Sequence, residues 1–212
     1  MRSRLIVSFV LIAFCVMTCP AMADMSVRMD TTNGGSPYLA TVTALSNPIL
    51  GHNPGDVFPT FCLEESEYFS PGHVYNVTLD MFAVRGGIDL DPTTPGKDYL
   101  DIATAWVYSQ FLDGGLSSSL NAAEVQNTIW CIEDEKAYST LNADEKALYN
   151  QARSASELWG TDFHGVQVMN LYGDYNPAQS QLVRAVAPVP APAALLLGLI
   201  GLGATAWLKK RA

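Results

Sequence analysis

The stretch E-V-Q-N-T-I-W-C-I-E-D-E, residues 124–135, has the apolar spacing of an α-helix, but a glutamine stands where an apolar side chain is expected. On a wheel of about 100° per residue that starts at Ala122, the apolar arc runs from about 280° to about 100°. Gln126 lies inside this arc at about 40°, and Cys131 lies opposite at about 180°. We therefore expect a buried Gln126 amide and a solvent-facing Cys131 thiol, and Glu133 points inward unless the helix frays.

Strand patterns surround this helix on both sides. β-branched and alternating residues predict strands in the first half of the chain, helix caps predict helices in the middle, and alternation returns near the end. This order indicates an α+β fold, a β-sheet or sandwich with an inserted helical segment. The expected strands span 38–45, 57–63, 73–84, 165–172 and 181–186, and the expected helices begin at Asp98, Asn121 and near Asn142.

The first 23 residues have the three parts of a secretory signal peptide. A basic M-R-S-R start precedes an apolar run, and the segment closes on A-M-A. We expect cleavage between Ala23 and Asp24. The alternative is an uncleaved anchor helix.

The C-terminal apolar run Ala193–Leu208 predicts a single transmembrane helix. Such a helix is about 24 Å long at about 1.5 Å per residue, slightly short of a bilayer core of about 30 Å. Trp207 suits the interface, and Lys209, Lys210 and Arg211 extend the reach by snorkelling. These cations are expected to stay cytoplasmic, which places the body of the protein outside.

The tail at 188–212 resembles the PEP-CTERM sorting signal of Gram-negative bacteria. It combines a Pro-x-Pro motif, Pro190 and Pro192, with an apolar helix and a basic end, although Ala191 replaces the usual glutamate. The resemblance implies an exosortase-type processing enzyme as a partner. It also implies an inner-membrane-anchored precursor destined for the envelope or the extracellular matrix. An ordinary single-span anchor is the alternative.

The segment 24–187 is the expected exported body, and its length suits one domain. It holds all 21 acidic residues and seven basic ones, which gives a net charge of −14. Because no basic patch is present to meet phosphates, nucleic acid is not an expected partner.

Cleavage of the signal would leave Cys62 and Cys131 as the cysteines of the mature chain. A pair of cysteines in an exported protein usually forms a disulfide. The sequence therefore supports a structural matrix or ligand-binding module with a Cys62–Cys131 disulfide and no reactive bond.

A second possibility begins with the inward glutamine. A thiol held against a glutamine carboxamide attacks it, expels ammonia and leaves a thioester, provided that the groups are close and water is excluded. Cys62 stands in the predicted strand 57–63, which is a suitable place to meet Gln126. Gln126 and Cys131 are about 140° apart on the helix. The Cys62 thiol therefore does not face both the Gln126 amide and the Cys131 thiol.

The motifs F-C-L at 61–63 and V-Q-N-T-I-W at 125–130 resemble those of the thioester domains of bacterial surface adhesins. Val125 and Thr128 differ from that family's T-Q-x-A-I-W pattern. The resemblance implies an internal thioester between Cys62 and Gln126. The side chains that it implies as support for this bond are Phe61, Ile129 and Trp130.

The same resemblance implies covalent attachment of the protein to an amine-bearing protein or polysaccharide on a surface. The target amine would attack the carbonyl derived from Gln126, and Cys62 would leave. This is single-use adhesion chemistry rather than turnover by an enzyme, and it requires no cofactor.

Other chemistries have weaker signals. A cysteine hydrolase would pair Cys62 with His73 or His164, but neither histidine lies in a nucleophile motif. The acidic loop at 86–96 does not have the spacing of an EF-hand, and the histidines are scattered. We therefore expect no metal site.

Overall fold

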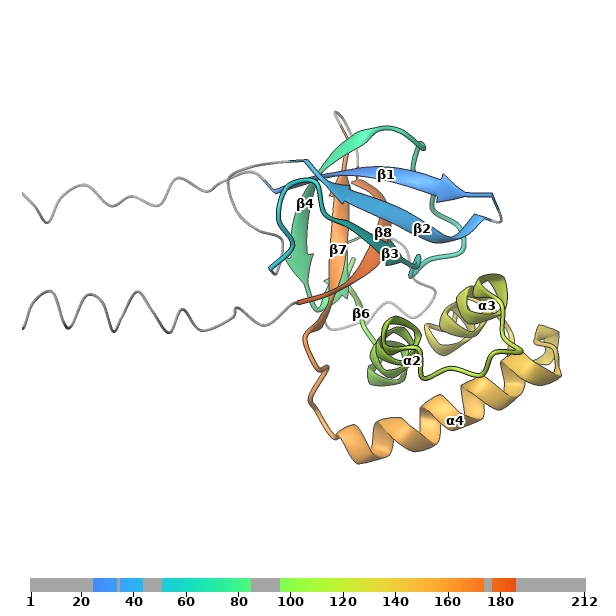
Figure 1. The fold of residues 1–212 in the computed structure, drawn as a ribbon. Helices are drawn as coiled ribbons and strands as arrows, with labels where there is room; N and C mark the ends of the chain where they lie inside the picture. Colours follow the sequence, from blue (N-terminus) through green and yellow to red (C-terminus); the bar gives the residue numbers. More distant parts are fainter. Residues whose placement is uncertain (1–24, 34, 44–50, 85–95, 174–176, 186–212) are drawn as a thin grey trace, which may run out of the picture.

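A computed structural model of the chain describes residues 25–33, 35–43, 51–84, 96–173 and 177–185 (Figure 1). These residues form an antiparallel sheet that carries three α-helices. The expected α+β class is confirmed at this level. The strands are β1 (Ser26–Thr32), β2 (Gly35–Val42), β3 (Val57–Thr60), β4 (Val74–Asp80), β5 (Phe82–Ala83), β6 (Asp98–Tyr99), β7 (Val166–Tyr172) and β8 (Pro177–Arg184). The helices are α2 (Ile102–Asp113), α3 (Ala122–Ile132) and α4 (Ala143–Trp159), with a short 3₁₀ turn, η1 (Tyr138–Thr140).

Six strands form one sheet in the order β3-β2-β1-β4-β7-β8, and every pair is antiparallel. The sheet curls until its two ends meet (Figure 1). The segment 61–63, directly after β3, runs beside β8: Leu182 N donates to Phe61 O at 3.0 Å, and Leu63 N donates to Ser180 O at 3.1 Å. The architecture is therefore one sheet closed into a barrel, not a sandwich of two sheets.

The barrel interior is filled by side chains that alternate along the strands, as the twofold period of a β-strand requires. The strand β1 contributes Val27 and Met29, and β2 contributes Ala40 and Val42, all buried. The alternation in β1 was present in the sequence, but this strand was missing from the prediction. The other buried residues of this core are Phe58, Tyr75, Val77, Met169, Leu171 and Val183.

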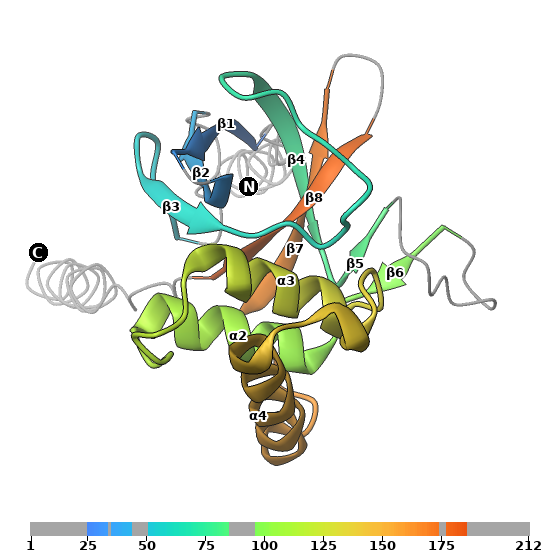
Figure 2. The ribbon, with the colours of Figure 1, turned by 90° about the vertical axis from the view of Figure 1, so that its right-hand side faces the viewer.

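A second core lies between the barrel and the helices. The helices α2 and α3 lie against one side of the barrel, and α4 crosses them on the side away from it (Figure 2). Phe61, Leu63 and Leu182 point into this core and meet Tyr108 and Ile129 from the helices. The segment 61–63 is therefore covered by barrel residues on one face and by helices on the other.

Side-chain caps set the starts of the helices. Asn121 and Glu124 form a reciprocal capping box at α3, as predicted, and Asn142 caps α4. At α2 the predicted cap is wrong: Asp98 lies in β6, and Asp101 accepts from Ala103 N at 2.7 Å. The pairing of β6 with β5 removes Asp98 from the helix and moves its start three residues on.

Both predicted targeting segments lie outside the described residues. This applies to the signal peptide at 1–23 and to the tail at 188–212, including the transmembrane run 193–208. Within the described residues, no helix combines the length and the apolar character needed to cross a bilayer.

Candidate functional site

Cys62 lies where the sheet closes. It forms an isolated antiparallel bridge with Gln181 of β8, and the backbones of its two neighbours are hydrogen-bonded to β8. Pro59 lies in β3, at the end of the strand order, where a residue without a backbone N–H is tolerated. Because Phe61 and Leu63 both point into the helical core, the Cys62 side chain points to the opposite face of this extended segment.

Gln126 reaches the same place from the helical side. Val125, Ile129 and Ile132 anchor α3 in the helical core, and Gln126 is 2% exposed. The predicted inward position of this amide is confirmed. A buried carboxamide is costly unless its polar atoms are hydrogen-bonded, so its partners decide what it does.

Both polar atoms of the Gln126 carboxamide bind the peptide groups of Cys62. Cys62 N donates to Gln126 Oε1 at 3.0 Å, and Gln126 Nε2 donates to Cys62 O at 2.8 Å. The carboxamide therefore completes the edge of the 61–63 segment that faces away from β8. In this position the Cys62 N–H also polarises the Gln126 carbonyl, as a backbone donor in an oxyanion hole does.

The Cys62 thiol has a separate set of neighbours. Gln181 Nε2 donates to Cys62 Sγ at 3.1 Å, and Tyr38 is the other side chain that lowers the pKa of this thiol. Burial raises the pKa of the thiol strongly; the hydrogen bonds from Gln181 and Tyr38 lower it, and the nearby Glu64 raises it further.

Glu64 is the second buried ionisable group at this position. It is fully buried, and neither oxygen of its carboxyl group has a hydrogen-bond partner among the described residues. Burial, with added repulsion from Glu67 and Asp98, raises its pKa to about 9. The group is therefore a neutral acid at pH 7, two residues beyond the thiol.

The three predicted supporting residues are all on elements that form the site. Phe61 and Ile129 are fully buried in the helical core, and Phe61 meets Phe111 edge to face at 4.8 Å between ring centroids. Trp130 is only half-buried, and Lys136 Nζ lies 5.5 Å from the centroid of its ring.

No family model, curated protein or solved structure matches this chain.

Cys131 is not where the helical wheel placed it. The prediction of a solvent-facing thiol is wrong: Cys131 is 3% exposed. The polar face of α3 is covered by α4, where Glu145 accepts from Asn127 Nδ2 at 2.7 Å and Arg153 donates to Ile132 O at 3.0 Å. A polar stripe thus lies at a helix–helix contact, which the pattern of one helix does not reveal.

The structure does not bring Cys62 and Cys131 together. Both are free thiols, so the alternative Cys62–Cys131 disulfide is absent. Charged groups near the Cys131 thiol belong to the helical layer, with Asp134 and Arg153 foremost, whereas the Cys62 thiol faces Gln181 and Tyr38.

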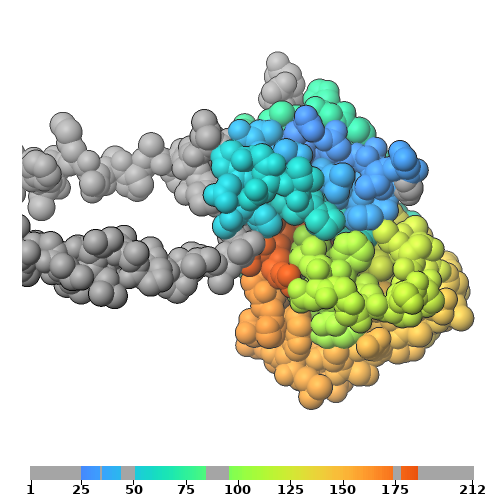
Figure 3. Space-filling model, viewed as in Figure 1, coloured from blue at the N-terminus to red at the C-terminus, as the bar shows by residue number. Residues whose placement is uncertain are grey.

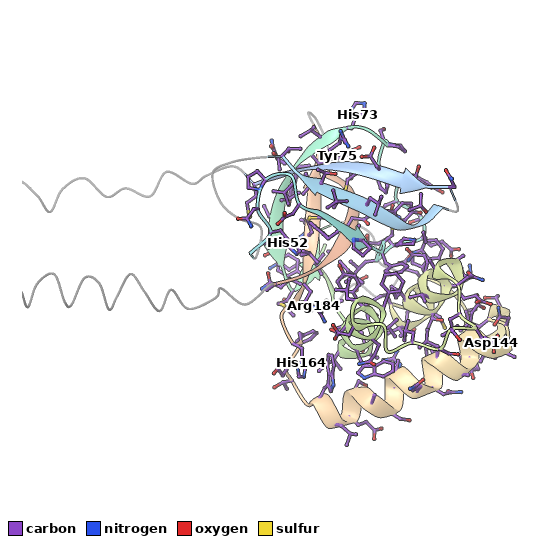
Figure 4. All side chains as sticks on the ribbon, viewed as in Figure 1. His52, His73, Tyr75, Asp144, His164 and Arg184 are labelled. Carbon is purple, nitrogen blue, oxygen red and sulfur yellow. The ribbon has the colours of Figure 1, made fainter. Side chains whose placement is uncertain are left out.

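The histidines do not approach the Cys62 thiol. Figure 4 shows His73 on the barrel at the end far from the helices, and His164 beyond the end of α4. The groups that act on the thiol are Gln181, Tyr38 and Glu64, so the pairing expected of a cysteine hydrolase does not form with His73 or His164.

Within the part of the chain that the structure describes, no group of three or more His, Cys, Asp or Glu side chains is placed to hold a metal ion. Most of the acidic loop at 86–96 lies outside the described residues.

Three residues of the site were missing from the sequence analysis: Gln181, Tyr38 and Glu64. Gln181 and Tyr38 each stood in a predicted strand, and Glu64 follows Cys62 by two positions. The approach of Gln181 depends on closure of the barrel, which pairs segments about 120 residues apart, and that of Tyr38 depends on the pairing of β2 with β3. Local periodicity carries no signal for either pairing.

Proposed function

We propose that Cys62 and Gln126 form an internal thioester, which attaches the protein covalently to amine-bearing surface targets. The observation that supports this most directly is the seating of the Gln126 carboxamide on the Cys62 peptide groups, with both residues buried. The carbonyl carbon of Gln126 is bonded to both atoms that contact Cys62, so the electrophile is held against the residue that carries the nucleophile.

Formation of the bond is a balanced acyl transfer. Cys62 Sγ attacks Gln126 Cδ, the Sγ–Cδ bond forms and the Cδ–Nε2 bond breaks. The thiol proton leaves with Nε2 as ammonia. The Cys62 N–H, 3.0 Å from Oε1, is placed to stabilise the negative charge that develops on this oxygen. Burial excludes the water that would hydrolyse the product.

The thiol also contacts Gln181, so the choice of acyl partner needs an argument. Among the described residues, the oxygen of Gln181 is hydrogen-bonded only by the Thr60 hydroxyl, at 3.4 Å, and its amide nitrogen is the atom turned toward the sulfur. Gln126 has a backbone donor on its oxygen at 3.0 Å. Gln126 is therefore the better-polarised carbonyl and the one that we assign to the thioester.

The product is a stored electrophile that is used once. An amine attacks Gln126 Cδ, the new Cδ–N bond replaces Cδ–Sγ, and the sulfur leaves and takes up the amine proton. Because the amide that remains does not regenerate the thioester, the protein would act as an adhesin rather than as an enzyme that turns over.

The test is the mass of the full chain before and after treatment with methylamine. We expect the protein to be lighter by one ammonia than its sequence requires, relative to a C62A variant made in the same way. Methylamine should add to Gln126 and free a thiol at Cys62. A C131A variant is the matched control and should behave as the unmodified chain does.

A chain that shows no ammonia loss and does not add methylamine would refute the thioester. A mass lower by two hydrogens that is restored by a reductant would instead establish the Cys62–Cys131 disulfide and a structural module.

We also propose that the protein is exported and held in the inner membrane by its C-terminal helix until an exosortase-type enzyme processes the tail. The support is the sequence of 1–23 and 188–212, with its basic end at Lys209, Lys210 and Arg211. Fractionation of cells that express the full chain, followed by terminal peptide mapping, tests this. We expect a chain that begins at Asp24 and lacks the residues after the Pro190–Pro192 motif; intact ends would refute the proposal.

A further inference from the structure

The Cys62 sulfur lies at one end of the barrel interior. Ala40 and Val42 of β2 and Phe58 of β3 line this interior, and side chains two residues apart share a face. At the end nearest the helices, the row of side chains on β2 continues with Tyr38, and the row on β3 continues with Thr60 and Cys62. The sulfur is therefore in a small polar group of side chains that the proposed acyl transfer does not yet use.

The Gln181 side chain is oriented so that its amide nitrogen, a hydrogen-bond donor, faces this sulfur. It is fully buried, its Oε1 lies 3.4 Å from the Thr60 hydroxyl, and its Nε2 lies 3.1 Å from Cys62 Sγ. Since Gln181 and Cys62 face each other across the β8 bridge, the backbone fixes the distance between the two side chains.

Tyr38 is the second polar side chain beside this sulfur. It stands opposite Thr60 on the neighbouring strand, it lowers the pKa of the Cys62 thiol, and its ring packs edge to face on Phe69 with 5.0 Å between centroids. Tyr38 is half-buried, unlike Gln181.

We infer that Gln181 and Tyr38 are catalytic hydrogen-bond donors. They stabilise the negative charge that develops on Cys62 Sγ when an amine opens the thioester. This inference rests on the proposed thioester. In the step concerned, the amine nitrogen bonds to Gln126 Cδ, the Cδ–Sγ bond breaks and its electron pair passes to the sulfur. The amine proton then neutralises the thiolate.

A buried thiolate needs such donors. Burial raises the pKa of the Cys62 thiol, and the neighbouring Glu64 raises it further. The hydrogen bonds from Gln181 and Tyr38 are the contributions that lower it. Without them the thiolate is a poor leaving group, because a group whose conjugate acid is weaker leaves more slowly.

The experiment measures the rate of methylamine incorporation into the full chain by mass spectrometry, for the unmodified protein and the Y38F, Q181M and Q179M variants. A hydrogen bond to a charged group accounts for roughly tenfold to a hundredfold in rate. We expect Y38F and Q181M each to slow incorporation by about that factor. The matched control is Q179M: Gln179 is buried on the same strand but donates to Glu64 O at 2.7 Å, not to the sulfur.

Incorporation at the unmodified rate in both Y38F and Q181M would overturn the inference while the thioester itself stands. Equal slowing by Q179M would also overturn it, since the effect would then come from packing. If the unmodified chain shows no ammonia loss, the proposed thioester fails first. Should Q181M not fold, Y38F decides alone, because it keeps the ring on Phe69 and removes only the hydroxyl.

Discussion

Cys62 and Cys131 are both buried free thiols, yet their surroundings differ in kind. Cys62 lies at the seam between barrel and helices, where one carboxamide binds its peptide groups and another binds its sulfur. Cys131 lies between two helices, among the charged groups of their contact. The space-filling view shows the helical residues packed against the strands as one continuous body (Figure 3). Burial alone thus does not distinguish the two cysteines; their neighbours do.

The largest expected effect is on the chemistry of the two cysteines. Replacement of Gln126 by alanine should abolish the ammonia loss completely, because the acyl carbon is gone, and C62A should do the same by removing the nucleophile. C131A should leave the ammonia loss intact. Intact-mass measurement checks all three, and retention of the loss in the Q126A variant would point to Gln181 as the true acyl partner.

The next largest effect is on the free energy of unfolding, and it concerns the hydrogen bonds that Gln126 makes to Cys62. A Q126L variant keeps the volume but leaves Cys62 N–H and C=O buried without partners, since both now bind the carboxamide. Each orphaned group costs about 1–3 kcal/mol, so we expect a loss of about 2–6 kcal/mol in the free energy of unfolding. Urea denaturation in a C62A background, where no thioester forms, measures it. A loss below about 1 kcal/mol would show that the two bonds are not made in solution.

A third difference lies in the pH dependence of stability. Folding raises the pKa of Glu64 from 4.5 to about 9, so the folded chain keeps a proton that the unfolded chain releases. The contribution of this proton to the stability of the folded chain is complete below pH 4.5 and is lost as the pH rises to about 9. We expect the free energy of unfolding to fall by roughly 1 kcal/mol per pH unit in this window.

An E64Q variant, which mimics the neutral acid, should reduce this slope. Glu133, whose pKa burial raises to about 8, supplies a further part of it. The matched control is D134N on the Cys131 side, because Asp134 is exposed and has the largest charge effect on the pKa of that thiol. Urea titrations between pH 5 and pH 9 compare the three chains; an unchanged slope in E64Q would mean that Glu64 is ionised in the folded state.

The smallest expected effect is that of Cys131 itself. Its side chain fills space beneath α4, and its removal leaves a gap of about one atom. We expect C131A to cost roughly 1 kcal/mol in the free energy of unfolding, with no change in methylamine incorporation. A loss of incorporation would mean that the packing of α3 against α4 affects the site at Cys62 and Gln126. The contrast between the two cysteines would then fail.

The part of this contrast that could be predicted is local. The wheel places Gln126 inward, and Asn121 and Glu124 mark the start of α3, because both depend on a few consecutive residues. The burial of Cys131 could not be predicted, since it depends on α4, which begins 12 residues later. Gln181 and Tyr38 were out of reach for the same reason: Gln181 meets the sulfur only after the sheet has closed, and Tyr38 only after β2 has paired with β3.

The closure of the barrel has a mechanical consequence. The covalent chain between a target held at Gln126 and the C-terminal end of β8 runs through α4 and β7, and residues 61–63 bridge its two ends, α3 and β8, directly. Under a pull, this bridge resists the separation of α3 from β8 before α4 and β7 are extended. It consists of the Gln126 carboxamide on one side and of the backbone hydrogen bonds of Phe61 and Leu63 with Leu182 and Ser180 on the other. The attached target would therefore load this short ladder before it loads the rest of the domain.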